Sequence, residues 1–202
     1  MKKNWVIAID AGHGKFTPGK QSPDGEKEWN FNNKVVQAIL NELGKYPMMK
    51  CVRVDDQTGK TDRSLYDRVQ IANKKKADIY ISSHHNASTG NWGTWTGVET
   101  FVMAPKVNNP KSTLLAQHIH LKVVTAMSLK NRGIKEADFY VLRETEMPAI
   151  LIEGGFMDSL IDIKKLRDDQ RLYEQGRAIA QGIVDYITFV NVLMKKIRFL
   201  FP

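Results

Sequence analysis

The sequence predicts a single α/β domain in which helices cover both faces of a mostly parallel, twisted sheet of about six strands. Short apolar segments alternate with segments of helical periodicity along the 202 residues. Several of the apolar segments have no polar face, as strands buried on both sides require. A hydrophobic content of 42% and a charged content of 26% are those of an ordinary globular domain of this length.

The strands are expected where short apolar segments rich in β-branched residues lie between turn residues. They cover residues 5–10, 49–54, 78–82, 97–104, 139–143 and 148–153. The first, WVIAID, ends in an Asp-Ala-Gly-His-Gly turn, and a loop rich in Gly, Pro, Lys and Asp follows it. The fifth and sixth are the segments FYVLR and PAILIE.

The helices are expected where apolar residues recur three to four positions apart. They cover residues 28–43, 64–77, 112–130 and, as a short helix followed by a long one, 162–190. The first begins at Glu28, and Gly44 is a suitable residue to cap its end. Because the helices alternate with the strands, they are expected to lie on both faces of the sheet.

The chain carries a net charge of +8, with 30 Lys and Arg residues against 22 Asp and Glu. Such an excess favours an anionic partner, such as nucleic acid, an acidic membrane or an anionic wall polymer. No nucleic-acid-binding motif accompanies the lysines, so we expect no nucleic-acid partner. No apolar run approaches the roughly 18 residues that span a bilayer, so we expect no stable membrane insertion.

Polar side chains follow three of the expected strands at their carboxyl ends. His13 follows the first strand, His84 and His85 end the third, and Glu153 ends the last. Ligands of such sheets bind at the carboxyl ends of the strands, so these residues are expected to meet at one rim. Neighbouring side chains of a strand point to opposite faces, so only one of the two adjacent histidines is expected to face a shared ligand.

Two neutral imidazoles and one carboxylate form a three-ligand set for Zn²⁺ that leaves one position open for water. A glutamate either completes this set or acts as the general base. Burial raises the pKa of a carboxyl such as that of Glu153, which suits a base. The remaining ligand is then Glu26 or Glu28, and helical periodicity favours Glu28 because it shares the inward face of its helix.

Five segments then follow one another in a distinctive order. They are IDAGHG (9–14), EWNFNNKVV (28–36), RVQIANKKKADIYISSHHNAS (68–88), GVETFV (97–102) and MPAILIEGGFMDS (147–159). Together they resemble the zinc-dependent N-acetylmuramoyl-L-alanine amidases of the type 3 amidase family, which occur in bacterial autolysins and phage endolysins. The resemblance implies a peptidoglycan hydrolase that cleaves the amide bond between the lactyl group of N-acetylmuramic acid and L-alanine.

The resemblance also implies roles for individual residues. One Zn²⁺ ion would be held by His13, Glu28 and His84, and Glu153 would be the catalytic glutamate. Asn86 matches the Asn of the family's Ser-x-His-x-Asn strand end and is a candidate contact of the substrate. His85 should then face away from the metal or line the cleft.

Four further residues are weighed as contacts of this site. Arg143 is expected near the rim, where it either binds substrate or forms a plain ion pair. Trp92 and Trp95 lie in an aromatic loop that either lines a glycan groove or anchors itself by packing. Asp10 is considered as an acceptor that would orient His13.

Residues 1–188 are expected to form the catalytic domain, and residues 189–202 a basic, apolar tail. This tail is a helix extension, a linker stub or an amphipathic segment that touches membrane. The N-terminal apolar run is too short for the core of a signal peptide, so we expect synthesis in the cytoplasm and action on the wall after lysis. The setting would be that of a phage endolysin or a bacterial autolysin.

Two other functions are weighed against the amidase. One is a different zinc peptidase, such as a carboxypeptidase that cuts the stem peptide. The other is a non-catalytic module that binds the wall. The anionic wall polymers that the positive charge favours are a further expected partner beside peptidoglycan itself.

Overall fold

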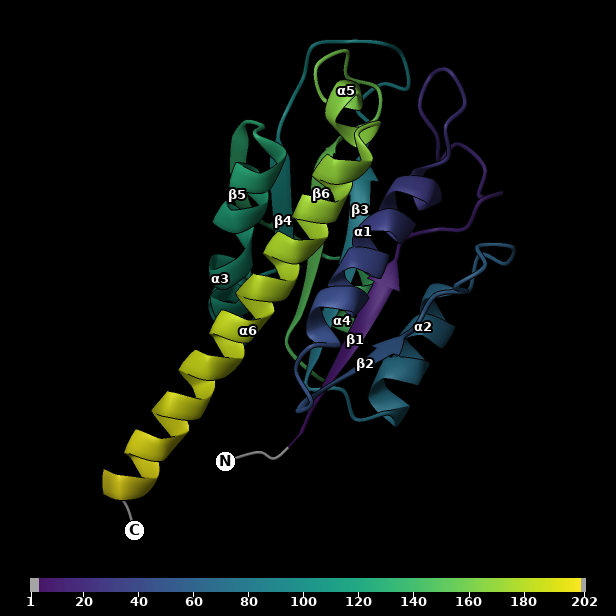
Figure 1. Cartoon of the computed structure of the whole chain (residues 1–202). Helices are drawn as coiled ribbons and strands as arrows, with labels where there is room; N and C mark the ends of the chain where they lie inside the picture. Colours follow the sequence, from purple (N-terminus) through teal and green to yellow (C-terminus); the bar gives the residue numbers. More distant parts are fainter. Residues whose placement is uncertain (1–3, 201–202) are drawn as a thin grey trace.

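A computed structural model describes the backbone of residues 4–200 and the side chains of residues 4–196. Six strands form one sheet in the order β2-β1-β3-β6-β4-β5 (Figure 1). They are β1 (Trp5–Ala11), β2 (Met49–Arg53), β3 (Ile79–Asn86), β4 (Val98–Met103), β5 (Asn131–Ala137) and β6 (Ala149–Phe156). Neighbouring strands are parallel except for β4 and β6, so the predicted mostly parallel α/β sheet is confirmed.

Helices cover both faces of this sheet. Three long helices pack on one face: α1 (Glu28–Leu43), α3 (Pro110–Met127) and α6 (Asp169–Leu200). The helices α2 (Leu65–Lys74) and α4 (Tyr140–Arg143) pack on the other face. Two short segments, η1 (Lys106–Asn108) and α5 (Ile163–Leu166), precede α3 and α6.

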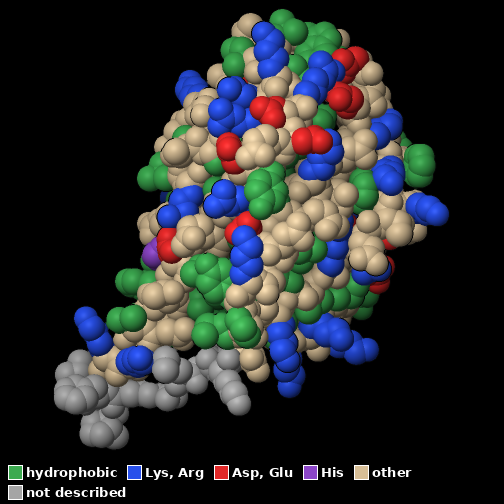
Figure 2. Space-filling model, in the orientation of Figure 1, with side chains coloured by type: hydrophobic (Ala, Val, Ile, Leu, Met, Phe, Trp, Pro, Cys, Tyr) green, Lys and Arg blue, Asp and Glu red, His purple; other side chains and the backbone are tan. Residues whose placement is uncertain are grey.

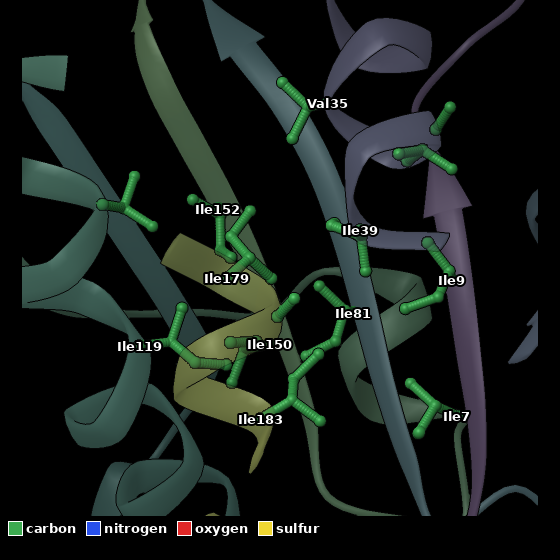
Figure 3. Close-up of a cluster of buried hydrophobic side chains, with 14 of the residues drawn as sticks. Ile7, Ile9, Val35, Ile39, Ile81, Ile119, Ile150, Ile152, Ile179 and Ile183 are labelled. Atoms are coloured by element: carbon green, nitrogen blue, oxygen red, sulfur yellow. The ribbon is translucent and has the colours of Figure 1, made fainter. Parts of the chain in front are cut away.

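The larger part of the core lies between the sheet and the three long helices (Figure 3). Ile7 and Ile9 of β1, Ile81 of β3 and Ile150 and Ile152 of β6 point into it and are fully buried. Alternate residues of the same strands point to the other face, where the core is smaller. This alternation decides which strand residues reach the cleft described below.

Residues 139–143 form no strand, and the sixth strand lies elsewhere. The segment FYVLR contains α4, a single helical turn with Val141 and Leu142 buried. The periodicity of so short an apolar run does not distinguish a helix from a strand. The missed strand β5 is polar and partly exposed because it lies at the edge of the sheet, where no continuous apolar run is required.

The last helix projects beyond the body of the protein (Figure 1). Ile187 is 1% exposed, whereas Phe189, Val192, Leu193 and Met194 are each almost half exposed. The 189–202 segment therefore continues α6 as far as Leu200, and its last two residues lie outside the described part. None of the described helices combines the length and the apolar character needed to cross a membrane.

Basic side chains are spread over the whole visible face of the protein rather than gathered in one patch (Figure 2). Acidic side chains lie among them on the same face. The net charge of +8 is therefore not concentrated at one place on this face.

Candidate metal centre

A cleft of about 600 Å³ opens on the face of the sheet that carries α2 and α4. His13, Glu28, His84 and Glu153 all line it. Three of them come from the carboxyl-terminal ends of β1, β3 and β6, and Glu28 comes from the first turn of α1. The structure therefore brings together four side chains that are far apart in the sequence.

Three of these side chains form one compact group. His13, Glu28 and His84 each offer a ligand atom, and these atoms lie within 4.8 Å of one another. Glu28 lies between the imidazoles, with Oε2 3.3 Å from His13 Nε2 and Oε1 3.0 Å from His84 Nδ1. The two rings meet edge to face, with 4.9 Å between their centroids. Two imidazoles and a carboxylate are a donor set that suits Zn²⁺.

The turn after β1 allows the two histidines to approach each other. A Cβ atom on Gly12 would lie 2.0 Å from Cε1 of His84, so only glycine fits at this position. His13 itself has a φ of 64°, a left-handed conformation that is unfavourable for a residue with a side chain. Backbone strain of this kind persists where the surrounding structure fixes it, and it is common at functional sites.

Charge interactions inside the group alter the pKa of each member. Burial alone would raise the pKa of Glu28, but the hydrogen bond and charge of His84 outweigh it and lower the pKa to about 2. Burial lowers the pKa of His13 to about 4, so its ring is neutral at pH 7. Burial would also lower the pKa of His84, but the hydrogen bond to Glu28 raises it. The metal-free group therefore combines a carboxylate with one imidazole that readily takes a proton.

Glu153 lies beside this group. It is paired with His84 in the register of β3 and β6. Its buried Oε2 has no hydrogen-bond partner among the described residues. Burial raises the pKa of the Glu153 carboxyl to about 8, and the nearby charges of Glu28 and Glu99 act in the same direction. An unpartnered carboxyl of raised pKa in a cleft is suited to take up a proton.

Asn32 and His85 support Glu28 from the opposite face of β3. Asn32 Nδ2 donates to Glu28 Oε1 at 3.2 Å and to the carbonyl of Gly12 at 3.0 Å. His85 Nδ1 lies 2.8 Å from Asn32 Oδ1, and its other ring nitrogen lies 3.2 Å from Gln175 Oε1. Asn32 was not expected at the site from the sequence, although its position four residues after Glu28 puts both on one face of α1.

Asp10 does not orient His13, which corrects that expectation. Its buried carboxylate forms an ion pair with Arg68 and accepts hydrogen bonds from Tyr80 at 3.0 Å and Ser82 at 2.9 Å. Arg68 in turn donates to the carbonyl oxygens of Ala11 and His13, at 2.9 and 3.0 Å. Asp10 thus holds the backbone of the turn through Arg68, without touching the His13 ring.

Glu26 lies away from the group, on the protein surface. Its Oε2 accepts from Arg167 Nε at 2.7 Å, and its side chain is 40% exposed. Glu28, by contrast, is 2% exposed. Between the two glutamates that the sequence offers, only Glu28 approaches the histidines.

The other residues that were expected to contact the site do not all line the cleft. Asn86 lines the cleft, where its Oδ1 accepts from the backbone of Ala87. Arg143 ends the helical turn α4, not a strand as expected, and it does not line the cleft because its guanidinium pairs with Asp138 and Glu144 on the surface.

Neither tryptophan of the aromatic loop lines the cleft. Trp95 packs against Gly93 and donates to Asp158 at 2.7 Å, and the guanidinium of Arg167 lies 6.0 Å from the ring of Trp92. Trp95 therefore anchors the loop, which was the alternative to a glycan contact, whereas Trp92 is 38% exposed. Phe139 and Tyr140, which the sequence analysis had assigned to a strand, line the cleft instead.

Comparison with known families supports the same site. A family model described as N-acetylmuramoyl-L-alanine amidase matches residues 7–185, which include all four cleft residues. The chain belongs to this amidase family. The resemblance stated from the sequence motifs is thereby confirmed.

Relatives of known sequence include amidases and an endolysin. The chain is 34% identical over 180 residues to the sporulation-specific N-acetylmuramoyl-L-alanine amidase of Bacillus subtilis (strain 168), covering 88% of this chain and 66% of that protein. It is 32% identical over 184 residues to the endolysin of Bacillus phage SPP1, covering 90% and 66%. An uncharacterized cell wall amidase of Bacillus anthracis is 36% identical over 190 residues, covering 90% of this chain and 35% of that protein. The chain thus spans between one third and two thirds of these relatives.

Solved amidase structures share the fold. The N-acetylmuramoyl-L-alanine amidase from Clostridium difficile 630 has a TM-score of 0.83 and 33% identity, over 92% of this chain and 98% of that one. The catalytic domain of CwlV, an N-acetylmuramoyl-L-alanine amidase from Bacillus (Paenibacillus) polymyxa var. colistinus, has a TM-score of 0.81 and 29% identity. It covers 91% of this chain and 98% of that one.

Proposed function

We propose that this domain hydrolyses the amide bond between the lactyl group of N-acetylmuramic acid and the L-alanine of the peptidoglycan stem peptide. The observation that carries the proposal is the His13–Glu28–His84 group beside Glu153, inside one cleft of a chain that belongs to the amidase family. The geometry of the group and the family match support each other, because the matched range includes the residues that form the group.

The donor set fits a single Zn²⁺ ion. Glu28 is almost fully buried, and the loss of hydration of a buried carboxylate must be offset by a cation or by hydrogen bonds. Its two oxygens already face two imidazole nitrogens. His13, Glu28 and His84 would hold the ion, and a bound zinc ion supplies Lewis-acid activation of water and of the scissile carbonyl.

Glu153 would be the general base. It accepts a proton from the attacking water, whose oxygen forms a bond to the carbonyl carbon as the carbon–nitrogen bond breaks. The same carboxyl then gives that proton to the departing amine of alanine. In the metal-free protein the pKa of Glu153 is about 8. A divalent cation nearby stabilises the carboxylate form and so prepares it to accept the proton.

The test is digestion of purified peptidoglycan before and after chelation, together with the metal content of the protein. The expected products are peptides with a free N-terminal alanine and an intact sugar chain. Chelation should abolish their release, and added Zn²⁺ should restore it. Glu153→Gln should retain the metal and release no peptide.

Product analysis also separates the two other functions. A carboxypeptidase would release a C-terminal amino acid and leave the alanine attached to the sugar. A wall-binding module would sediment with the wall and release nothing. Either result, obtained with metal-loaded protein, contradicts the amidase proposal.

We also propose that the net charge of +8 holds the domain near anionic wall polymers. Added salt screens such attraction. The rate of hydrolysis of intact walls should therefore fall steeply as salt is added, whereas the rate on a small soluble muramoyl-peptide should change little. If the two rates of hydrolysis depend equally on salt, the proposed attraction to anionic wall polymers is contradicted. The site of action would be the bacterial wall, reached after lysis, in either of the two settings that the relatives represent.

A further inference from the structure

The cleft has two walls of different chemistry. Phe139, Tyr140, Val141 and Leu151 make one wall apolar and partly aromatic. A second wall is formed by the loop after β1 and by the segment that leads into α2, and it contains Lys20, Asp62, Arg63 and Ser64. The metal group lies where the loop after β1 meets β3, so a substrate bound across it would have one half on each wall.

Lys20 is fixed in position by its backbone, whereas its side chain is free. The Lys20 carbonyl accepts a hydrogen bond of 3.0 Å from the amide of Glu28. This bond ties the loop to the residue that contributes the carboxylate of the metal group. No ion pair or side-chain hydrogen bond engages the Lys20 ammonium within the part of the chain that the structure describes.

The charge of Lys20 acts inside the cleft. Burial is the main cause of the lowered pKa of His13, and the Lys20 ammonium acts in the same direction. At Glu153, where burial raises the pKa, the ammonium acts against it. Both effects place a positive charge near the reacting groups. The Asp62 carboxylate, which also lines the cleft, acts against Lys20 at His13, but it pairs with Arg68 and not with Lys20.

Arg63 is the second cation of this wall, and it differs from the neighbouring Arg68. Arg68 pairs with Asp10 and Asp62 and donates to two backbone carbonyls, so its charge is balanced. Arg63 donates from Nη1 to the carbonyl of Val54 at 2.9 Å and forms no ion pair with a described residue. Its remaining N–H groups are therefore available to a ligand of the cleft.

The two halves of the proposed substrate match the two walls. The acyl half carries an uncharged sugar, whose apolar ring face suits aromatic side chains. The amine half is a peptide, and its carboxylates are the negative charges of the substrate. Arg and Lys bind carboxylates by charge-assisted hydrogen bonds, which are stronger than neutral ones.

We infer that Lys20 and Arg63 form a carboxylate-binding subsite for the peptide half of the substrate, so the domain selects stem peptides with a free carboxylate close to the alanine. This inference rests on the proposed amidase function and specifies its substrate class. The carboxylate belongs either to the residue after the alanine or to the C-terminus of the peptide.

The experiment uses soluble muramoyl-L-alanyl peptides and the metal-loaded protein. In the first pair of substrates, the residue after alanine carries a free carboxylate or the matching carboxamide, and both peptides end in an amide. In the second pair, that residue is a carboxamide, and the C-terminus is free or amidated. A preference for the acid, by about tenfold in kcat/KM, is the size expected for one charge-assisted hydrogen bond.

Substitutions test whether Lys20 and Arg63 cause the preference for the acidic substrate. Lys20→Met should remove most of the preference, because it should slow the acidic substrate about tenfold more than the amide counterpart, whatever its effect on both substrates through the charge near Glu153. Lys20→Arg should keep it, and Arg63→Met should weaken it. Lys60→Met is the matched control, because Lys60 is exposed and lies outside the cleft. Metal content should be unchanged in each variant, because Lys20 reaches Glu28 only through its backbone.

The outcomes separate the two proposals. If the wild-type protein cleaves no substrate, the proposed amidase function is wrong. If it cleaves acids and amides of both pairs at equal rates, or if Lys20→Met and Arg63→Met both keep the full preference, the subsite is wrong and the amidase function stands. A preference in the first pair assigns the carboxylate to the residue after alanine, and one in the second pair assigns it to the C-terminus.

Discussion

Glu28 Oε1 lies 3.0 Å from His84 Nδ1, although 56 residues separate the two in the chain. The contact is possible because α1 begins where β3 ends, at the rim of the sheet. The same carboxylate also accepts a hydrogen bond from Asn32 and faces His13. Glu28 thus connects the start of α1 to the ends of β1 and β3.

Replacing Glu28 should abolish metal binding. Glu28→Gln keeps the shape of the side chain but removes the negative charge between the imidazoles, so zinc affinity should fall by more than about a hundredfold. Glu26→Gln is the matched control, since Glu26 pairs with Arg167 on the surface. Zinc titration monitored by calorimetry measures the zinc affinity of both variants. Equal affinities for the two variants would show that Glu28 is no ligand.

A methyl group at Gly12 should displace His84. The added Cβ would lie 2.0 Å from the ring, and that contact is too short for any neighbour to accommodate without moving. Gly12→Ala should therefore bind zinc weakly while remaining folded by circular dichroism. Gly44→Ala, at the end of α1, should bind zinc as the wild type does. Normal zinc binding by Gly12→Ala would argue against His84 as a ligand.

Asn32 should contribute to metal affinity without contacting the metal. Its side chain holds a Glu28 oxygen, and the loss of such a supporting hydrogen bond weakens metal binding by about 10- to 100-fold. The test is Asn32→Ala in a competition titration against a chelator. Asn33→Ala, which loses a part-buried hydrogen bond with Arg53 and no contact with Glu28, should have the affinity of the wild type.

Glu153 should destabilise the metal-free protein at alkaline pH. Its folded pKa of about 8 exceeds the ordinary 4.5, so between these values the folded state holds a proton that the unfolded state has lost. The free energy of unfolding therefore decreases as the pH rises through this range. Glu153→Gln should raise the Tm by roughly 5 °C at pH 8 and by little below pH 4.5. A Tm difference independent of pH would contradict a buried, protonated Glu153.

We propose that the folded domain ends near residue 188, as the sequence suggested. Tyr186 and Ile187 are buried, whereas Phe189, Val192, Leu193 and Met194 are each almost half exposed. A chain that ends at Asn191 should keep its Tm within about 2 °C and its activity on a soluble muramoyl-peptide. A chain that ends at Val184 loses both buried side chains and should unfold at a clearly lower temperature.

Much of the site could be predicted because strand alternation and topology constrain it. Residues that end parallel strands share one rim, and alternation separates His84 from its neighbour His85. The partners of Asp10 could not be predicted, since Arg68 reaches it from α2 only after the sheet and helix have packed. Lys20 gave no signal either, because nothing in a loop sequence indicates which lysine lacks a carboxylate partner.

The parts of the fold that were mistaken are those with little sequence periodicity. The strand β5 lies at the edge of the sheet and contains more polar than apolar residues. The helix α4 has only four residues, too few to show a helical period. The strand β5 pairs with β4, and α4 packs against α2, β6 and β4. Such contacts leave no local pattern in the chain.

The projecting end of α6 also has a practical consequence for engineering. From Thr188 to Leu200 the helix adds about 18 Å of stiff spacer, at the rise of an ordinary α-helix. Its far end points away from the end of the sheet where α1 begins (Figure 1). A fluorescent tag or a targeting module fused there would be held clear of the mouth of the cleft, so bulky wall fragments could still enter.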